Sequence, residues 1–443
     1  MELLVYFVLK NANNYEQFNI DRFYKDYLIG PKIFKNRGAL DSSYIPDELP
    51  HRDKEIQKIA EITACALMGD TPPSFLCYGM TGTGKTATIR YVSQKLAQQS
   101  LENKPWWIYI NCNVVSTPYR ILAHIYNTIS GKEKIPPTGL PKDIIFKQLL
   151  GLMDQKIGNS ICFLVLDEID ILANKRGSNE ILYDLTRLNE NLDLCKTSLI
   201  GISNKLKFKE SLDPRVLSSL GEEAPIVFHP YNANELREIL QKRANIAFYD
   251  GALEEEVIGL CAGLAAKEDG DARKALQLLR KAGEIAHRAQ NKVVTTKHVY
   301  DAREDLEKDH IVEYILGLPF QAQLILTAIY LMSKFNPERA IISGDINEVY
   351  VELCNIFPGT RKLSERRISD YINELSLSGI VSAPVKSMGH YGRTKIVKLD
   401  INLDLTERAL KKIEKIDKIL DYKPVLLQAD KVKLKNNVFK KII

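Results

Sequence analysis

Residues 79–86 read Gly-Met-Thr-Gly-Thr-Gly-Lys-Thr, a segment with the residue types needed to bind a phosphate chain. Its glycines allow backbone N–H groups to close around a phosphate at the start of a helix. Lys85 is placed to bind the β- and γ-phosphates of a nucleoside triphosphate, and Thr86 to ligate Mg²⁺. The predicted nucleotide contacts in this segment and directly after it are Gly79, Thr81, Gly82, Thr83, Gly84, Lys85, Thr86 and Ala87.

The local setting of this loop is the one that phosphate binding requires. The preceding apolar run, residues 74–78, predicts a short buried strand, and residues 87–96 continue as an amphipathic helix. A strand, a glycine-rich loop and a helix therefore follow one another in the order that this phosphate-binding motif needs.

A second apolar run, residues 161–166, ends in Asp167 and Glu168. Its continuous hydrophobicity indicates a strand that is buried on both faces, as in the centre of a parallel sheet. Asp167 is expected to complete a Mg²⁺ site with Thr86, and Glu168 to orient and polarise the attacking water. An acidic pair after an apolar run commonly marks only the end of a strand, but together with the glycine-rich loop it predicts a nucleotide site.

Two further polar residues, Asn204 and Arg215, are candidates for contacts with a γ-phosphate. Asn204 follows an apolar strand at 197–203 and is placed to sense the phosphate or hold the water, the alternative being a turn-forming residue. Arg215 precedes a helix and is suited to reach a neighbouring subunit's γ-phosphate, the alternative being a surface salt bridge. Arg273 lies in the first turn of a helix at 270–289, and the local pattern alone indicates a solvated helix residue.

The composition indicates an ordinary globular protein. At 443 residues, with 45% hydrophobic and 26% charged residues, the chain is long enough for two or three domains. Its seven cysteines are scattered without a CxxC pair, so neither a zinc site nor a disulfide framework is indicated, and a reducing intracellular compartment is expected. The apolar run at residues 1–10 is too short to span a bilayer and lacks signal-peptide features. We interpret it as a strand or a disordered extension and expect no membrane contact.

Positive charge is concentrated near the C-terminus. Residues 361–443 contain 19 lysines and arginines against 10 acidic residues, a net charge of +9, whereas the whole chain carries only +5. If the protein binds a polyanion, the C-terminal part is the expected contact surface, the alternative being a solvated basic face.

The pattern of the C-terminal region is that of a winged helix. After a charged linker at 301–309, the periodicity predicts helices at about 311–334, interrupted near 317–319, and at 343–355 and 364–377. Two strands, 380–385 and 395–399, flank a basic, glycine-containing tip at 386–394. A Lys-rich amphipathic helix at 404–420 follows, and the basic tail at 431–441 receives no role.

The predicted helix at 364–377 has the features of a DNA-recognition helix. Ile368, Ile372 and Leu375 form its buried stripe, which leaves a polar face available to a major groove. Winged helices also dock proteins, so the pattern alone leaves both ligands open. The candidate DNA contacts are Arg366, Arg367, Tyr371, Asn373, Lys386 and Arg393.

The order of the motifs resembles that of a known family. GMTGTGKT, FLVLDEID, ISNK, LDPRVLSSL, FHPY and GDARKAL succeed one another as in the initiator branch of the AAA+ ATPases. More narrowly, the chain is similar to archaeal replication initiators related to eukaryotic origin-recognition subunits and the Cdc-type helicase loader. The resemblance extends from about residue 45 to about residue 400.

This resemblance implies roles for individual residues. Asn204 corresponds to the sensor-1 residue, Arg215 to the arginine finger and Arg273 to the sensor-2 arginine of the lid. Residues 111–120 resemble the segment in which initiators carry a helical insertion. The resemblance adds further nucleotide contacts. They are Pro50, His51 and Arg52, in a segment that lies against the adenine in the family, and Tyr231 of the FHPY motif.

The expected fold is α/β, with a AAA+ P-loop core in which helices sandwich a parallel sheet, an α-helical lid and a winged-helix domain. The expected boundaries are 1–45 for an N-terminal extension, 46–230 for the core, 231–305 for the lid, 310–400 for the winged helix and 401–443 for a basic C-terminal helix and tail.

The expected function is that of a slow, switch-like ATPase that uses ATP/ADP and Mg²⁺, binds double-stranded origin DNA and helps to recruit the replicative helicase. Other initiator subunits are expected partners, and a cytoplasmic, nucleoid-associated location is expected. An ATP-dependent winged-helix transcription regulator is the alternative. A clamp-loader subunit is less favoured, because that family typically has SRC where this chain has Arg215–Ser219, and lacks a winged helix.

Overall fold

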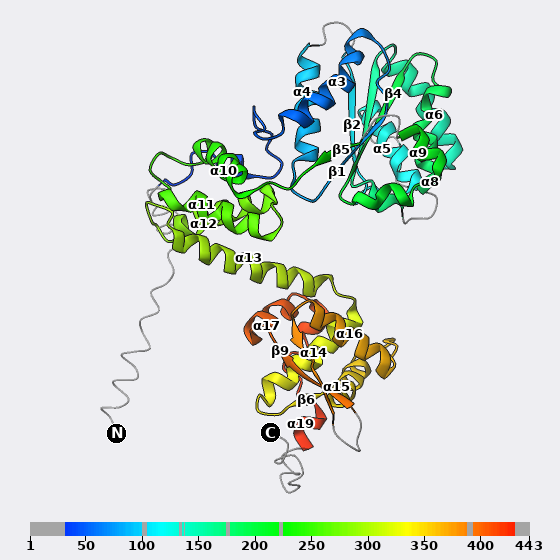
Figure 1. The fold of residues 1–443 in the computed structure, drawn as a ribbon. Coiled ribbons are helices and arrows are strands. Elements are labelled where there is room, and N and C mark those ends of the chain that lie inside the picture. The colour runs from blue at the N-terminus through cyan, green and yellow to red at the C-terminus, as the bar shows by residue number, and fades with distance from the viewer. Residues whose placement is uncertain are drawn as a thin grey trace. The chain divides into compact units, whose positions relative to one another are not determined.

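The computed structural model describes residues 32–99, 104–132, 135–136, 138–173, 178–220, 225–387 and 393–429. The chain divides into two compact units, Met1–Ala302 and Arg303–Ile443 (Figure 1). None of the helices in these ranges combines the length and apolar character needed to cross a bilayer. The predicted N-terminal strand or extension at 1–10 and the basic tail at 431–441 lie outside the described residues.

The first unit is built on a five-stranded parallel sheet of order β2-β3-β4-β1-β5. This order places the ends of β1, β3 and β4 side by side, so the residues that follow these strands meet at one edge of the sheet. The predicted parallel sheet is confirmed, and the apolar run at 161–166 forms a buried strand inside it. The strands are β1 Phe75–Gly79, β2 Trp106–Asn111, β3 Ile161–Asp167, β4 Lys196–Ser203 and β5 Ile226–Phe228.

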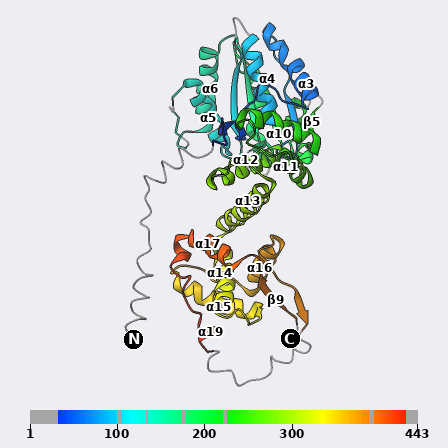
Figure 2. The ribbon, with the colours of Figure 1, turned by 90° about the vertical axis from the view of Figure 1, so that its left-hand side faces the viewer.

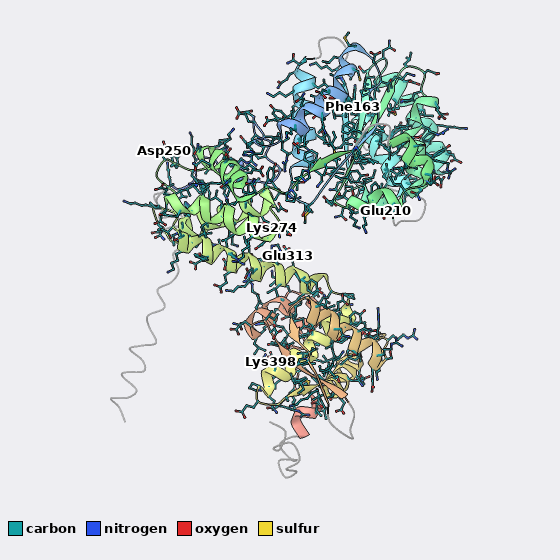
Figure 3. The ribbon with its side chains drawn as sticks, in the orientation of Figure 1. Phe163, Glu210, Asp250, Lys274, Glu313 and Lys398 are labelled. Atoms are coloured by element: carbon teal, nitrogen blue, oxygen red, sulfur yellow. The ribbon has the colours of Figure 1, made fainter. Side chains whose placement is uncertain are left out.

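Helices cover both faces of this sheet, which gives the expected sandwich (Figure 1). Phe163 of β3 is fully buried on the α3/α4 side and stacks on Trp107, with ring centroids 4.1 Å apart (Figure 3). One face carries α3 Asp53–Ala64 and α4 Lys85–Gln99. The other carries α5 Pro118–Ser130, α6 Lys142–Lys156, α8 Ser178–Thr186 and α9 Pro214–Leu220, while the short α7, Asp170–Ala173, follows β3.

Asp154, at the end of α6, fixes the turn that leads into β4. Its carboxylate accepts backbone N–H bonds from Asp193 (3.1 Å), Leu194 (2.9 Å) and Cys195 (2.8 Å). Although partial burial opposes the shift, these bonds hold the pKa of Asp154 below its usual value. We expect Asp154→Ala to lower the free energy of unfolding by about 1–3 kcal/mol, since three N–H groups lose a charged acceptor. Chemical denaturation at pH 7 measures this loss.

The same contacts predict a pH dependence. Because the folded-state pKa of Asp154 is depressed, its contribution is present above the unfolded-state pKa and is lost as pH falls through the folded value. The difference between wild type and Asp154→Ala is therefore expected to shrink below about pH 4. Asp154→Asn, which retains a neutral acceptor, should fall between the two. A difference that stays constant with pH would contradict the role of the charge.

The rest of the first unit is helical. A lid of α10 Ala233–Ala247, α11 Glu255–Glu268 and α12 Ala272–Arg288 follows β5. Part of the segment predicted as an N-terminal extension packs on this lid: Phe34 contacts Phe248, with ring centroids 4.9 Å apart, and Leu40 of the 3-10 helix Arg37–Leu40 is buried. Gly283 of α12 makes room, because a Cβ there would lie 2.5 Å from Phe34.

The predicted charged linker at 301–309 contains the boundary between the two units, Ala302 and Arg303, and it is helical, because these residues belong to α13, Thr296–Gly317. Ion pairs one turn apart, Arg303 with Glu307 (3.0 Å) and Lys308 with Glu304 (2.6 Å), support a helix without a strong apolar stripe. The helix ends at Gly317 and α14 begins at Phe320, so the predicted interruption near 317–319 is confirmed.

The second unit packs three helices around a small antiparallel sheet (Figure 2). Its centre is α14, in which residues 322–332 are buried, and the predicted helix–helix–helix–hairpin order is confirmed. The helices are α14 Phe320–Phe335, α15 Ser343–Ile356 and α16 Glu365–Leu377. The strands are β6 Ile341–Ile342, β7 Val381–Ser382, β8 Val385–Ser387 and β9 Arg393–Leu399.

Three details of the second unit differ from the prediction. The single strand predicted at 380–385 is divided into β7 and β8 around Pro384, which has no N–H for the ladder. The two-residue strand β6 was not predicted. The single helix predicted at 404–420 is α17 Leu403–Lys411 and α18 Glu414–Asp417, separated by Ile413 in an extended conformation (φ −96°, ψ 99°).

Candidate functional site

Lys85, the first residue of α4, lies beneath the phosphate loop and is 5% exposed. Its Nζ donates to the carbonyl oxygens of Gly79 (2.8 Å) and Met80 (2.7 Å). Burial lowers the pKa of Lys85 to about 8, although the nearby Asp167 carboxylate favours the charged form. An ammonium held in this way is suited to an anionic ligand, which would supply the charge that the loop carbonyls only partly provide.

At two positions of the phosphate loop, neighbouring atoms leave no room for a side chain, so glycine is required. Gly82 has φ +72°, and a Cβ there would lie 1.7 Å from Oδ1 of Asp271 in the lid. Gly84 has φ +89°, and its Cβ would lie 2.9 Å from Oη of Tyr231. The backbone N–H of Ala272 also donates to the carbonyl of Gly82, at 3.2 Å. The phosphate loop is therefore in direct contact with Tyr231, which precedes the lid, and with the start of the lid helix α12.

Asp167 and Thr86 lie together, as the predicted Mg²⁺ site requires. The Thr86 hydroxyl donates to Oδ2 of Asp167 at 2.8 Å. Hydroxyl and carboxylate oxygens are ligands that Mg²⁺ accepts, so these residues fit the ion. Glu168 has a left-handed backbone (φ 56°), and burial together with Asp167 and Asp170 raises the pKa of its carboxyl group. A strained acid with a raised pKa at a strand end has the properties of a functional group.

Asn204 is positioned by a buried acid. Asp170, 6% exposed, accepts from the Asn204 backbone N–H (3.1 Å) and the Ser203 hydroxyl (3.2 Å), and Lys205 lies 3.7 Å away. The loop after β4 is thus anchored to the start of α7, which leaves the Asn204 side chain at the cavity described next.

A cavity of about 680 Å³ lies between the sheet edge, the lid and the N-terminal segment of the first unit. The predicted site residues that line it are Pro50, Gly82, Gly84, Lys85, Thr86, Ala87, Asp167, Glu168, Asn204, Tyr231 and Arg273. The predicted residues that do not line it are His51, Arg52, Gly79, Thr81, Thr83 and Arg215.

Arg52 lies outside the cavity lining because its guanidinium binds backbone. Its nitrogens donate to the carbonyls of Thr83 (2.9 Å), His51 (3.0 Å) and His229 (2.7 Å), and it stacks on Tyr231 at 3.8 Å. It therefore ties the phosphate loop to the chain after β5. His51 has φ 62°, and its ring contacts Glu238 of α10 at 3.0 Å.

The two predicted arginines occupy different positions. Arg273 lines the cavity and is 53% exposed, with Nε 3.6 Å from Oδ1 of Asp271, the N-cap of α12. Arg215 is 70% exposed at the start of α9, where Asp213 binds it. Of these two arginines, Arg273 alone lines the cavity in which a nucleotide would bind.

In the second unit, α16 has the predicted amphipathic character. Ile368, Ile372 and Leu375 are buried, at 2%, 0% and 0% exposure. Arg366, Arg367, Asn373 and Lys386 are exposed and Tyr371 is half-buried beneath Arg367, whose guanidinium lies 5.2 Å from the ring. Arg393 begins β9, and its side chain is outside the described part of the chain.

Comparison with known proteins places these features in a family. Residues 69–207 match an AAA domain, 237–304 a Cdc6 AAA+ ATPase-type lid domain and 313–409 the CDC6 C-terminal winged helix domain. The chain is 48% identical to the ORC1-type DNA replication protein of Pyrococcus abyssi over 390 residues, 87% of this chain and 92% of that one. The chain belongs to the ORC1-type DNA replication protein family.

Other members of the family agree along nearly the whole length. ORC1-type DNA replication protein 1 of Methanosarcina acetivorans is 42% identical over 409 residues, 91% of this chain and 97% of its own. The structure of Aeropyrum pernix ORC1 in complex with DNA is 41% identical and has a TM-score of 0.75, with coverage of 87% of this chain and 99% of that one. The predicted family and fold class are confirmed.

One wall of the cavity was not predicted from the sequence. Residues 42–44 and 46–49 line it, together with Ile239, Lys242, Arg243 and Ile246 of α10. The helical spacing of these α10 positions indicates a shared face, but nothing in the sequence says what that face contacts. Arg90 and Asn111 complete the missed set on the sheet side.

No group of three or more His, Cys, Asp or Glu residues suited to a metal is present among the described residues. The Mg²⁺ prediction therefore depends on Thr86 and Asp167 together with a nucleotide, as in sites where phosphates complete the coordination.

Lys395 of β9 fixes the DNA candidate Asn373. Its Nζ donates to Oδ1 of Asn373 (2.8 Å) and to both oxygens of Ser369, and burial lowers the pKa of this ammonium. We expect Lys395→Met to weaken DNA binding about 3- to 10-fold, because a freed Asn373 loses its orientation. Lys398→Met, which removes an exposed charge from the same strand, is the matched control. Fluorescence anisotropy with duplex DNA measures both variants, and equal losses would show that only charge matters.

Proposed function

We propose that this protein is an ATP-dependent initiator of DNA replication that binds origin duplex DNA and helps to recruit the replicative helicase. The observation that carries the proposal is the agreement of core, lid and winged helix with Aeropyrum pernix ORC1, whose structure was solved in complex with DNA. The names of the relatives, ORC1-type DNA replication proteins, support the same function. The domain boundaries predicted from the sequence are part of this proposal.

The nucleotide chemistry is assigned to residues of the cavity. The loop amides and Lys85 bind the phosphates, and Thr86 and Asp167 hold Mg²⁺, which would neutralise charge on the phosphate oxygens. Glu168 orients the attacking water. Its raised pKa is consistent with accepting a proton. Asn204, anchored by Asp170, holds the water or contacts the γ-phosphate.

Nucleotide state is proposed to set the arrangement of core and lid. Asp271 contacts Gly82 of the loop and caps the helix that carries Arg273, so a phosphate that displaces the loop or attracts Arg273 acts on the lid directly. Through this coupling the protein would act as a switch between nucleotide states.

Completion of the hydrolytic site is assigned to a second initiator subunit. Arg215 is 70% exposed and does not line the cavity of its own chain, so it is available to a neighbour's γ-phosphate. Arginine fingers supplied in trans are worth roughly 10³–10⁵ in rate, so a single subunit is expected to hydrolyse ATP slowly.

DNA binding is assigned to the second unit and its basic surroundings. The exposed side of α16 enters a major groove, while Lys386 and Arg393 of the wing contact the adjacent backbone. The net charge of +9 for residues 361–443 predicts strong salt dependence. This assignment implies association with the nucleoid.

A genome-wide occupancy map in the protein's own cells, overlaid on replication start positions, tests this function. Occupancy confined to a few start zones supports initiation and supplies the recognised sequence. Occupancy spread over many promoters would instead identify an ATP-dependent transcription regulator, with the same nucleotide site and a different output.

A further inference from the structure

The guanidinium of Arg215 is bound by an acid of its own chain. Oδ1 of Asp213 accepts from Nε at 3.1 Å and Oδ2 accepts from Nη2 at 3.0 Å, so the two groups form a bidentate pair. Oδ1 also accepts the Arg215 backbone N–H at 2.9 Å. The donors that would grip a phosphate are therefore already engaged by a carboxylate with similar geometry.

An aromatic ring supports the same position. The guanidinium carbon of Arg215 lies 5.1 Å from the ring centroid of Tyr183 in α8, and Arg187 lies 4.8 Å from the same ring. Cation–π attraction and the ion pair thus hold Arg215 against its own core. The group remains 70% exposed, so a ligand in solution can reach it.

The lid arginine provides a comparison within the same chain. Asp271 stands two residues before Arg273, as Asp213 stands before Arg215, and its Oδ1 also accepts the backbone N–H of that arginine, at 2.7 Å. The guanidinium of Arg273, however, approaches Asp271 only through Nε at 3.6 Å. An Asp-x-Arg sequence therefore does not by itself produce the bidentate pair, which Arg215 forms and Arg273 does not.

We propose that Asp213 and Tyr183 form a clamp that holds Arg215 and must release it before Arg215 can bind a neighbouring subunit's γ-phosphate. The proposal rests on the trans role of Arg215 proposed above. Asp213 is then a positioning residue that restrains hydrolysis between subunits. Loosening the clamp should speed the trans reaction, whereas a residue that merely supports α9 would slow it when replaced.

The expected effect is small and depends on salt. Because the pair is exposed, its loss should raise the efficiency of the trans reaction by about two- to fivefold at low salt. The gain should be smaller near 0.5 M salt, where charges at the surface are screened over about 4 Å. Asp213→Asn is the appropriate change, since asparagine retains the acceptor for the Arg215 N–H and is an equally good helix N-cap.

A two-component assay isolates the trans reaction. The acceptor is the full chain with Arg215→Ala, which retains its nucleotide site, and the donor is the full chain with Glu168→Gln, which supplies Arg215 but hydrolyses poorly. Phosphate release is measured with ATP, Mg²⁺ and sheared genomic duplex DNA from the protein's own cells, over a range of donor concentrations. The measured quantity is a ratio, the maximal rate of phosphate release divided by the donor concentration at which half of that rate is reached.

Introducing Asp213→Asn into the donor should raise this ratio two- to fivefold at low salt and by a smaller factor at 0.5 M salt. Tyr183→Leu in the donor should also raise it, while Tyr183→Phe, which retains the ring, should match the original donor. An unchanged or lower ratio with Asp213→Asn, when the original donor stimulates the acceptor, overturns the clamp alone. Failure of the original donor to stimulate the acceptor overturns the trans role of Arg215 and the clamp with it.

Discussion

Replacing Lys85 with alanine is expected to weaken ATP binding by about 100-fold or more, since removal of one partner from a buried charge contact typically costs 2–5 kcal/mol. Lys85 is the positively charged side chain at the base of the loop, 5% exposed and bonded to the carbonyls of Gly79 and Met80. Without it, the phosphates would face those carbonyls directly. The loss should therefore exceed the cost of a single neutral hydrogen bond.

Isothermal titration with ATP and Mg²⁺ measures this loss, with Lys85→Met as the matched variant that retains the buried aliphatic stem. If charge is the cause, both substitutions should have the same effect. The second unit has a hydrophobic core of its own, so weak binding to duplex DNA should persist in both variants. ATP affinity close to that of wild type in Lys85→Met would contradict the assignment of the phosphate site.

The central part of this site could be predicted from the sequence because its determinants are local. The order of glycines, Lys85 and Thr86 specifies a loop at a helix start, and an uninterrupted apolar run before Asp167 specifies a central parallel strand. In such sheets the strand ends meet at one edge, which is why residues 81 positions apart, Thr86 and Asp167, form a hydrogen bond.

The remaining parts depend on tertiary contacts that leave no local pattern. Residues 42–44 and 46–49 line the cavity beside a segment that packs on the lid, where Phe34 occupies the space left by Gly283. Arg52 lies in the predicted adenine segment, yet three backbone carbonyls bind its guanidinium. The boundary at 301–309 could be predicted but its helix could not, because the ion pairs that support this helix leave no apolar stripe.

Gly82→Ala is expected to have the second large effect, because it places a methyl group where the lid contacts the phosphate loop. The new Cβ would lie 1.7 Å from Oδ1 of Asp271, and the backbone at φ +72° already disfavours any side chain. Asp271 must then move, which removes the N-cap of α12. We expect the free energy of unfolding of the first unit to fall by about 2–4 kcal/mol and ATP affinity by about 10-fold or more.

A second glycine separates the two causes of this loss. Gly69 has φ +85°, and a Cβ there would meet no atom within 4 Å, so Gly69→Ala introduces backbone strain without a collision. The excess of Gly82→Ala over Gly69→Ala, measured by denaturation and ATP titration, is then the effect of the loop–lid contact. Asp271→Ser, which shortens the side chain and retains a helix cap, should recover part of that excess when combined with Gly82→Ala.

Equal effects of the two glycine substitutions, or simple additivity with Asp271→Ser, would mean that loop and lid are not coupled through this contact. Recovery would instead identify Asp271 as the residue through which the phosphate loop acts on the lid, and would place the switch at that contact.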